Sequence, residues 1–351
     1  MDLSKVTIII PSYKRHEYAI NALKYWSKYE VDLHLVDGSD NPILNIDEEI
    51  KNSRIKYHHI KILSEVDRIK KILPLIKTKY TILSSDDDLL LPKALSNCLE
   101  EIEKDDDIIS CYGQTLSFYK IENTTMFQHT DYKLINFKNV SNSSVERINK
   151  HMNEYVPSIV YSVMPTDIFQ NIFEVENPSE YEYLSSMELR VTLLITYYGK
   201  SKTINDLLVL RRKSGISAIT RNSQNTSFFR TMFLPKQKSQ RIKFINDLII
   251  SIKKREKKDA EALKKIFNSA FRKYLFFTLK IFLKKGLFMI IINNIRFLYF
   301  MRREKKIKNL LNFDELSSFC NKKNINLSKI DHDLMKNIFL EKVNKKTDIN
   351  D

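Results

Sequence analysis

Three short apolar segments near the start of the chain, each followed directly by a polar cluster, constrain the fold more than any other feature. Residues 5–10, 31–36 and 80–83 are rich in β-branched or aromatic side chains and are short enough to be buried strands. Segments with the apolar spacing of helices, 17–29 and 67–76, separate them. Because strands and helices alternate, we expect an α/β fold with a mostly parallel sheet covered on both faces.

Further elements follow along the chain. We expect strands over residues 55–60, 108–113, 159–164 and 202–210, a helix that starts near Pro92, and helices over 143–155 and 187–198. From about residue 228 onward the pattern is helical and basic, without a strand signal. Residues 214–225, rich in Ser and Asn, are interpreted as a loop. The sequence thus predicts an α/β domain over residues 1–213 and a helical region over residues 226–351.

The three polar clusters should lie together in space. Residues 11–15 follow the first of the three segments, residues 37–40 the second and residues 84–88 the third. In a parallel sheet the carboxyl ends of the strands share one edge, and ligands bind in the loops beyond that edge. The sequence therefore predicts a ligand site built from these loops.

The last cluster contains three consecutive carboxylates, Asp86, Asp87 and Asp88. Packing carboxylates side by side raises the pKa of at least one of them unless a cation neutralises them. Mg²⁺ and Mn²⁺ prefer carboxylate oxygens together with substrate phosphates. The cluster therefore indicates a site where a metal ion joins the protein to a diphosphate. The alternative is a solvated acidic turn before the next helix, whose dipole favours acids there.

Asp37 closes the second strand of this group. A carboxylate at a strand end can accept hydrogen bonds from a base or a ribose. In the alternative interpretation it forms an Asx-turn with the residues that follow. His16, close to the first cluster, is interpreted as a structural or solvated side chain rather than a ligand contact.

Three motifs carry a resemblance to a known family. Residues 7–15 (TIIIPSYKR), 36–39 (VDGS) and 80–92 (YTILSSDDDLLLP) resemble, in order and spacing, the opening of family 2-like bacterial glycosyltransferases of the GT-A fold with a DDD motif. The resemblance covers roughly residues 5–213. It implies a Rossmann-like nucleotide-binding mixed sheet, followed here by the mostly α-helical basic region. Such enzymes often build capsules or lipopolysaccharide.

The resemblance also implies roles for the residues of the three clusters. The loop after the first strand would line the nucleotide-sugar through Pro11, Ser12, Tyr13 and Arg15, and Asp37 would contact the base. Asp86 would reach the ribose. Asp87 would hold Mn²⁺ or Mg²⁺ on the diphosphate, with Asp88 as support or as a second ligand. Ser85 stands where the family usually has its first acid, a departure from the pattern.

Glu188 matches the position at which inverting members of the family hold a general base. That carboxylate deprotonates the acceptor hydroxyl as its oxygen attacks the anomeric carbon. From the residues alone, Glu188 is equally a first-turn helix acid, and Glu182 is the runner-up as base. Arg211, with Arg212 and Lys213, either clamps the donor phosphates or forms a solvated basic turn.

The expected function is a metal-dependent, inverting glycosyltransferase that uses a nucleotide-sugar, with UDP-sugars favoured. Its acceptor would be a glycan or a lipid-linked glycan, bound by loops such as residues 116–141. A nucleotidyltransferase is one alternative. Such an enzyme would need a Gly-rich phosphate loop after the first strand, whereas residues 11–15 contain no Gly. The other alternative is a non-catalytic protein on the same scaffold that binds membranes or polyanions.

The positive charge of the chain belongs to one region. The formal net charge is +15, and residues 228–308 hold 23 Lys and Arg against 5 Asp and Glu. Helices that interleave Phe, Leu and Ile with Lys and Arg, as residues 271–303 do, commonly lie on anionic membrane surfaces. An ordinary helical bundle with a basic solvated face is the alternative. Nucleic acid is a less favoured partner, because no recognised motif accompanies the charge.

Cysteines and apolar runs bear on the compartment. The three cysteines, Cys98, Cys111 and Cys320, have neither metal-site nor redox-pair spacing, and we expect small buried thiols. The first apolar run meets Pro11 too soon for a signal peptide. Residues 287–301 are interrupted by polar side chains and fall short of a membrane span. These features predict a cytoplasmic protein. If it contacts the membrane, we expect peripheral attachment at the inner face.

Overall fold

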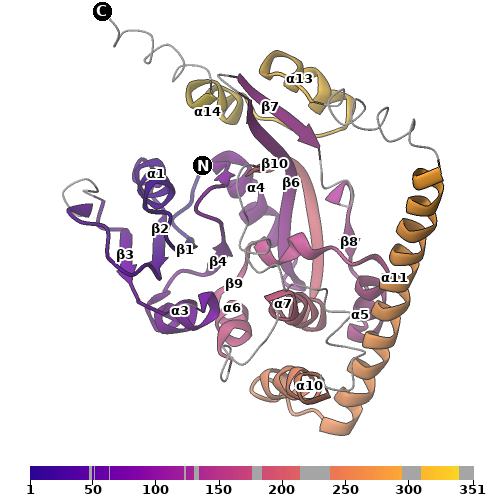
Figure 1. The fold of residues 1–351 in the computed structure, drawn as a ribbon. Coiled ribbons are helices and arrows are strands. Elements are labelled where there is room, and N and C mark those ends of the chain that lie inside the picture. Colours follow the sequence, from indigo (N-terminus) through magenta and orange to yellow (C-terminus); the bar gives the residue numbers. More distant parts are fainter. Residues whose placement is uncertain are drawn as a thin grey trace, which may run out of the picture.

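Figure 1 shows the fold of the protein in a computed structural model. The structure describes residues 1–46, 50, 52–62, 64–121, 124–129, 134–175, 184–213, 238–294 and 310–339. The expected loop over residues 214–225 and the runner-up base Glu182 lie outside these ranges.

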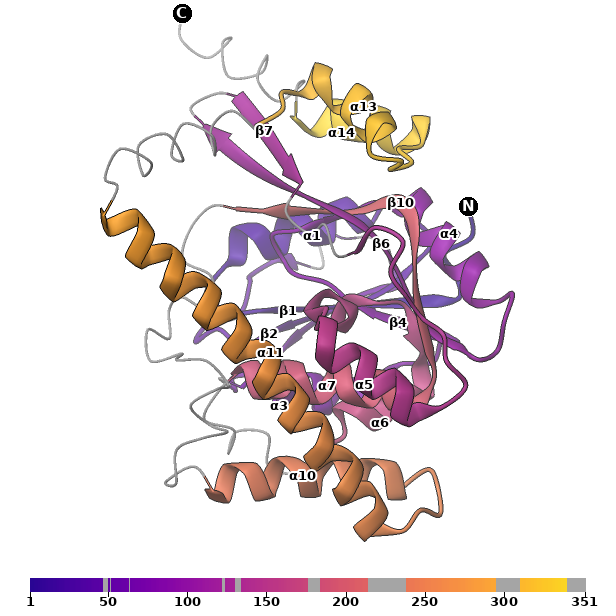
Figure 2. The ribbon, with the colours of Figure 1, turned by 90° about the vertical axis from the view of Figure 1, so that its right-hand side faces the viewer.

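A parallel sheet forms the N-terminal half, as the alternation of strands and helices predicts. Its strands β1 (Val6–Ser12), β2 (Asp32–Asp37), β3 (Ile55–His59) and β4 (Tyr80–Leu83) lie in the order β3-β2-β1-β4, and the short β9 (Met164–Pro165) pairs antiparallel with β4. Helix α1 (His16–Trp26) covers one face, while α3 (Glu65–Ile72) and α6 (Thr166–Phe173) cover the other (Figures 1 and 2). Because both faces are covered, Ile8, Ile9 and Ile10 are all buried in the centre.

A second, mixed sheet stands beside the first. Its order is β5 (Leu89–Leu90), β10 (Lys200–Arg212), β6 (Ile108–Ile121) and β7 (Thr124–His129), and β8 (Lys138–Asn139) also pairs with β10. The expectation of a short strand over 108–113 and a loop over 116–141 was wrong in part. Strand β6 continues to Ile121 and turns back as β7. The alternation was hard to recognise because polar residues of β6, including Gln114 and Ser117, are buried as fully as its apolar ones.

The strand expected over residues 159–164 was wrong for most of its length, because only Val163 and Met164, at its end, pair with other strands. Its first residues belong to a 3₁₀ helix, η3 (Pro157–Tyr161), which leads into β9. A short apolar run that is buried on several sides does not reveal its period, and Pro157 suits a first helical turn. The other helices lie close to their expected ranges: α4 (Pro92–Ile102), α5 (Ser144–Glu154) and α7 (Leu184–Tyr198), with η1 (Leu73–Leu75) after α3.

The C-terminal region is helical, as expected, and packs onto the α/β half in two separate places. Helices α10 (Lys238–Lys253) and α11 (Ala260–Asn294) lie against α7 and α5 at one end of the molecule. Helices α13 (Phe313–Lys322) and α14 (Lys329–Phe339) lie against β7 and α4 at the other end (Figures 1 and 2). Helix α11 runs between the two ends along the side of the molecule.

Two buried polar contacts attach these helices to the α/β half. The guanidinium of Arg190 in α7 is fully buried and donates to the Ile172 carbonyl and to Ser251 Oγ of α10, each at 2.6 Å. The carboxylate of Asp331 in α14 accepts from the Lys93 backbone amide at 3.2 Å. Helix α4 has Leu91 at its N-cap, which offers no side-chain acceptor, so Asp331 supplies the missing cap from the far end of the chain.

Cys98, Cys111 and Cys320 are free and buried, which confirms the expectation of buried thiols. Across the described ranges, every helix is either too short or too polar to cross a bilayer.

Candidate active site at the carboxyl edge of the parallel sheet

The register of the sheet brings the three predicted loops together. Ser12, the last residue of β1, pairs with Asp37, the last residue of β2, and Ile9 pairs with Leu83 at the end of β4. The loops that follow these strands therefore leave the sheet at one edge, and their side chains reach one another there. The predicted convergence of the polar clusters is confirmed at the level of the backbone.

Arg15 holds the first two carboxylates of the triplet. Its guanidinium lies 3.0 Å from Asp86 Oδ1 and also pairs with Asp87 Oδ2. Ser12 Oγ donates to Asp86 Oδ2 at 2.7 Å, and Ser85 Oγ donates to Asp87 Oδ1 at 2.6 Å. Burial raises the pKa of Asp86 to about 6, although Arg15 and Ser12 act in the opposite direction. The loop after β1 is therefore bound to the acidic loop through Ser12 and Arg15.

The third carboxylate, Asp88, is turned towards β10. Its Oδ2 lies 3.7 Å from Arg211 Nε, and its Oδ1 accepts from the Arg212 backbone amide at 3.1 Å. Burial raises the pKa of Asp88 to about 6, although the charge of Arg211 acts in the opposite direction. The Arg212 guanidinium lies over the Tyr18 ring, 4.9 Å from its centroid, and Arg15 lies over the same ring at 4.5 Å. Three arginines from two elements thus surround the acidic loop, a supply of charge suited to a diphosphate.

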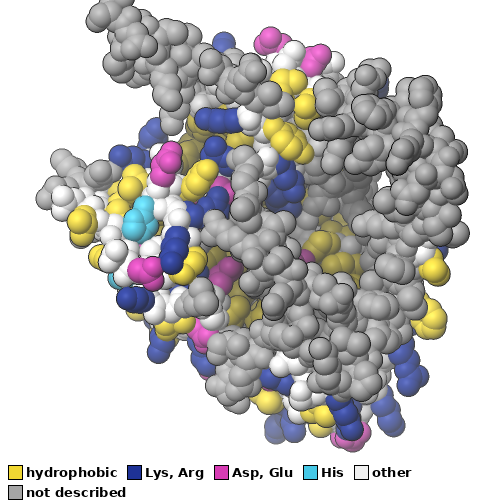
Figure 3. Space-filling model, in the orientation of Figure 1, with side chains coloured by type: hydrophobic (Ala, Val, Ile, Leu, Met, Phe, Trp, Pro, Cys, Tyr) yellow, Lys and Arg dark blue, Asp and Glu magenta, His cyan; other side chains and the backbone are white. Residues whose placement is uncertain are grey.

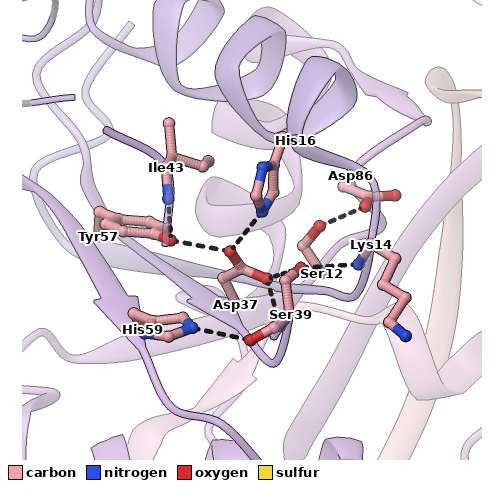
Figure 4. Close-up of polar contacts among 9 residues, drawn as sticks. All are labelled: Ser12, Lys14, His16, Asp37, Ser39, Ile43, Tyr57, His59 and Asp86. Carbon is pink, nitrogen blue, oxygen red and sulfur yellow. Dashed lines mark hydrogen bonds and ion pairs between the residues drawn. The ribbon is translucent and has the colours of Figure 1, made fainter. Parts of the chain in front are cut away.

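Asp37 is enclosed by its neighbours (Figure 4). Its Oδ1 accepts from the Ser39 amide at 2.8 Å and from Ser39 Oγ at 2.5 Å, while Tyr57 donates to its Oδ2 at 2.8 Å. His16 Nε2 lies 3.3 Å from the same Oδ2. The Asx-type contact with Ser39 that the alternative interpretation foresaw is present. His16, interpreted as structural or solvated, contacts Asp37. A contact between Asp37 and a base stays a prediction, and it would have to displace one of these partners.

Gly38 explains the second motif in physical terms. A Cβ added at this position would lie 2.4 Å from Arg68 Nη1 and 2.8 Å from the Ile62 carbonyl oxygen. Arg68 is buried and donates to that carbonyl at 2.6 Å. Gly38 therefore allows the guanidinium of α3 to pass directly beneath the loop after β2. The same loop is tied to the first one by Ser39 Oγ, which accepts from the Lys14 amide at 2.7 Å.

Glu188 lies in α7, on the side of the acidic loop where Arg211 and Tyr161 are found. Burial raises its pKa, whereas a hydrogen bond from Tyr155 and the charge of Arg211 lower it. The Tyr155 hydroxyl donates to Glu188 Oε1 at 3.4 Å. A half-buried carboxylate with a raised pKa has the properties of a general base.

Tyr161 links the two parts of the site. Its pKa is raised by burial and by the nearby carboxylates of Glu65, Glu188 and Asp88, while Arg211 lowers it. The Arg211 guanidinium lies 5.7 Å from the centroid of its ring. Charges from α3, α7, β10 and the acidic loop therefore all act on this one tyrosine.

Some site residues were not predicted from the sequence. Glu65, whose pKa burial raises with a further contribution from Asp86, begins α3. Tyr18 lies on α1 and Tyr161 on η3. No spacing in the sequence marks them, because each reaches the site through tertiary packing. Of the predicted residues, Pro11 is half-buried at the end of β1 and Tyr13 is half-buried in the loop beyond it. Their contact with a nucleotide stays a prediction.

In the part of the chain that the structure describes, no three His, Cys, Asp or Glu side chains converge as a metal site. Asp87 and Asp88 offer carboxylate oxygens, the ligand type that Mg²⁺ and Mn²⁺ prefer. Such ions are commonly held by one or two carboxylates, with substrate phosphates completing the coordination, so these two residues suit an ion that arrives with a diphosphate.

Comparison with solved structures identifies the fold. The structure of S. aureus TarS 1-349 in complex with UDP-GlcNAc is similar, with a TM-score of 0.52 and 12% identity, over 78% of this chain and 73% of that chain. Two further structures of S. aureus TarS, the first of them TarS 1-349, each give a TM-score of 0.45 at 12% identity. They cover 80% and 77% of this chain and 92% and 54% of their own. The expected GT-A-type α/β fold with a helical C-terminal region is confirmed. No protein-family model and no curated protein matches the chain.

Proposed function

We propose that this protein is a metal-dependent, inverting glycosyltransferase that moves a sugar from a nucleotide-sugar, with UDP-sugars favoured, to a glycan or lipid-linked glycan of a bacterial surface polysaccharide. One observation carries the proposal. The acidic triplet and its arginines lie at the carboxyl edge of a parallel sheet, where nucleotides bind in open α/β folds, and a half-buried carboxylate on α7 lies within electrostatic reach of Arg211.

The donor assignment rests on charge and on fold. A diphosphate needs cations, and Arg15, Arg211 and Arg212 lie around the acidic loop. The TarS structure that shares this fold was solved with UDP-GlcNAc, which supports a nucleotide-sugar of the uridine type here. Mn²⁺ or Mg²⁺, held by Asp87 and Asp88, would offset the charge that develops on the departing diphosphate.

The chemical step is assigned to Glu188. Its carboxylate accepts the proton of the acceptor hydroxyl, and the oxygen forms a bond to the anomeric carbon. The bond between that carbon and the diphosphate oxygen breaks, and the nucleoside diphosphate leaves with the electron pair. Attack from the side opposite the leaving group inverts the anomeric centre. The burial that raises the pKa of Glu188 makes it a stronger base than an exposed Glu.

The decisive test is thermal stabilisation by a panel of nucleoside diphosphates, each with and without Mn²⁺. A ligand that binds the folded state raises the melting temperature by mass action, and a ligand at 100 times its Kd stabilises by about 2.7 kcal/mol. We expect UDP to stabilise the protein in the presence of Mn²⁺ and Asp87→Ala to lose the effect.

The chain contains a matched control. Asp105, Asp106 and Asp107 form a second aspartate triplet, exposed in the loop before β6. Asp106→Ala should respond to UDP and Mn²⁺ as the wild type does. If no nucleotide stabilises the folded wild type, or if both variants respond alike, the proposed donor site is wrong.

A further inference from the structure

Helix α11 has two opposite faces with different partners. Its inner face carries Leu263, Phe267, Ala270 and Phe271, all buried against the body of the protein. Phe267 follows Leu263 by four residues, and Ala270 and Phe271 follow Phe267 by three and four, so all four lie on one helix stripe. The stripe fixes how the helix is turned, and it therefore also fixes which residues point outward.

The outer face exposes two large apolar side chains. Phe276 is 70% exposed and Leu283 is 58% exposed. Together with Arg272 and Lys280 they follow a spacing of four, four and three residues, so all four lie on one stripe opposite the buried one. Lys265, seven residues before Arg272, extends the same stripe. In Figure 2 this helix runs across the near side of the molecule.

The charge on this face has one sign. Helix α11 contains seven Lys and Arg and a single acid, Glu261. Glu261 pairs with Lys264, and within the described ranges no carboxylate forms an ion pair with Lys265, Arg272 or Lys280. Figure 3 shows hydrophobic and basic side chains together along the edge where α11 runs in Figure 1.

We propose that the outer face of α11, defined by Lys265, Arg272, Phe276, Lys280 and Leu283, docks on the surface of an anionic lipid bilayer. The basic residues would be attracted to the negative headgroups, and Phe276 and Leu283 would enter the boundary between headgroups and acyl chains. The helix is about 50 Å long at 1.5 Å per residue, so it would lie along the surface. This inference does not depend on the proposed enzymatic function.

Lipid fits this face better than a soluble polyanion does. An acidic glycan or a nucleic acid would satisfy Arg272 and Lys280, but it would leave Phe276 and Leu283 in water. A second copy of the same face would bring like charges together, which is unfavourable. A lipid surface accepts both kinds of side chain.

Co-sedimentation of the full chain with vesicles tests the inference. One vesicle preparation is phosphatidylcholine alone, and the other contains phosphatidylcholine and phosphatidylglycerol in equal parts. The variants are Phe276→Ser with Leu283→Ser, and Arg272→Gln with Lys280→Gln. The control is Lys329→Gln with Ile330→Ser on α14, because Ile330 is 59% exposed and so matches Leu283. All of these positions are exposed, and circular dichroism would establish that each variant is folded.

We expect binding to the anionic vesicles only. Affinity should fall about fivefold for each charge removed and about tenfold for each apolar side chain removed, and the α14 control should leave it unchanged. Equal binding to neutral vesicles would overturn the inference. So would loss of binding in the charge variant alone, which would indicate a soluble polyanion, or sedimentation without vesicles, which would indicate self-association.

Discussion

The chain contains two aspartate triplets, and the structure treats them in opposite ways. At the carboxyl edge of the sheet, the side chains of Asp86, Asp87 and Asp88 are 3%, 15% and 13% exposed, and arginines hold each of them. In the loop before β6, the side chains of Asp105 and Asp107 are 45% and 70% exposed. There Asp105 accepts from the Asp107 amide at 3.0 Å in an ordinary Asx-type turn.

The difference shows that position relative to a strand, rather than composition, decides what an acidic run does. The first triplet follows a buried strand and is drawn into the sheet edge, where burial raises the pKa of Asp86 and Asp88. The second precedes a strand and stays in water, where Lys200 lowers the pKa of Asp107. The buried acids of the first triplet are stabilised by arginines and by hydrogen-bond donors, whereas the exposed ones are stabilised largely by water.

The largest effect is expected for Glu188, the half-buried acid to which the chemical step is assigned. Glu188→Gln should lower kcat by about 10² to 10⁴, because the amide cannot accept the acceptor proton. Stabilisation by UDP and Mn²⁺ should be unchanged, because Glu188 is assigned to proton transfer from the acceptor and not to donor binding. The measurement is the rate of UDP-sugar turnover with an identified acceptor.

Two observations would sharpen this result. Glu154→Gln, an exposed acid at the end of α5, should leave turnover unchanged. Only the carboxylate form of Glu188 can take the proton, so activity should be lost as the pH falls through the raised pKa. The acidic limb should therefore lie above the usual range of a Glu. If the kcat of Glu188→Gln lay within tenfold of the wild-type value, Glu188 would not be the general base.

The next effect concerns the cations rather than the acids. Arg15→Met removes the guanidinium from Asp86 and Asp87 and should lower the free energy of unfolding by about 1–3 kcal/mol at pH 7. This is less than the cost of breaking a fully buried pair, because the Arg15 side chain is 24% exposed. Urea unfolding would measure it.

Lys200→Met is the matched change at the second triplet. It removes the partner that lies 2.8 Å from Asp107, and we expect no measurable change in the urea midpoint. If the two variants lost equal stability, the contrast between the triplets would not be energetic.

The smallest effect is expected for a single buried acid far from the site. Asp331→Ala should destabilise the protein by about 1 kcal/mol, because helix α4 loses its cap and the Lys93 amide loses its acceptor. Asp333→Ala, an exposed change on the same helix, should be neutral. Turnover and vesicle binding should be unaffected in both. An equal loss of stability in the two variants would mean that the cap contributes nothing.

Much of the site edge could be predicted from the sequence. The pairing of Ser12 with Asp37 follows from two apolar runs of similar length that end in polar residues. Patterns of this kind depend on a few neighbouring residues, so they can be recognised from the sequence alone.

What the sequence concealed depends on residues distant along the chain. Tyr161 lies on a segment that was expected to be a strand, and Asp37 is enclosed by Tyr57 and His16 from two other elements. The hairpin of β6 and β7 was concealed for a different reason. Its buried face includes polar residues, which removes the alternation that marks a strand.

The cap that Asp331 gives to α4 has a consequence for the order in which the protein is made. The acceptor lies 238 residues beyond the amide it serves. At about 5–20 residues per second, the ribosome would take on the order of tens of seconds to deliver α14 after α4 has emerged. During that interval Phe127 of β7 lacks Phe313 and Phe339, which pack against it in the finished protein. The cap of α4 and the aromatic contacts of β7 can therefore form only after α14 has been made, and such long-range closure is slow and exposes apolar surface to chaperones and to aggregation.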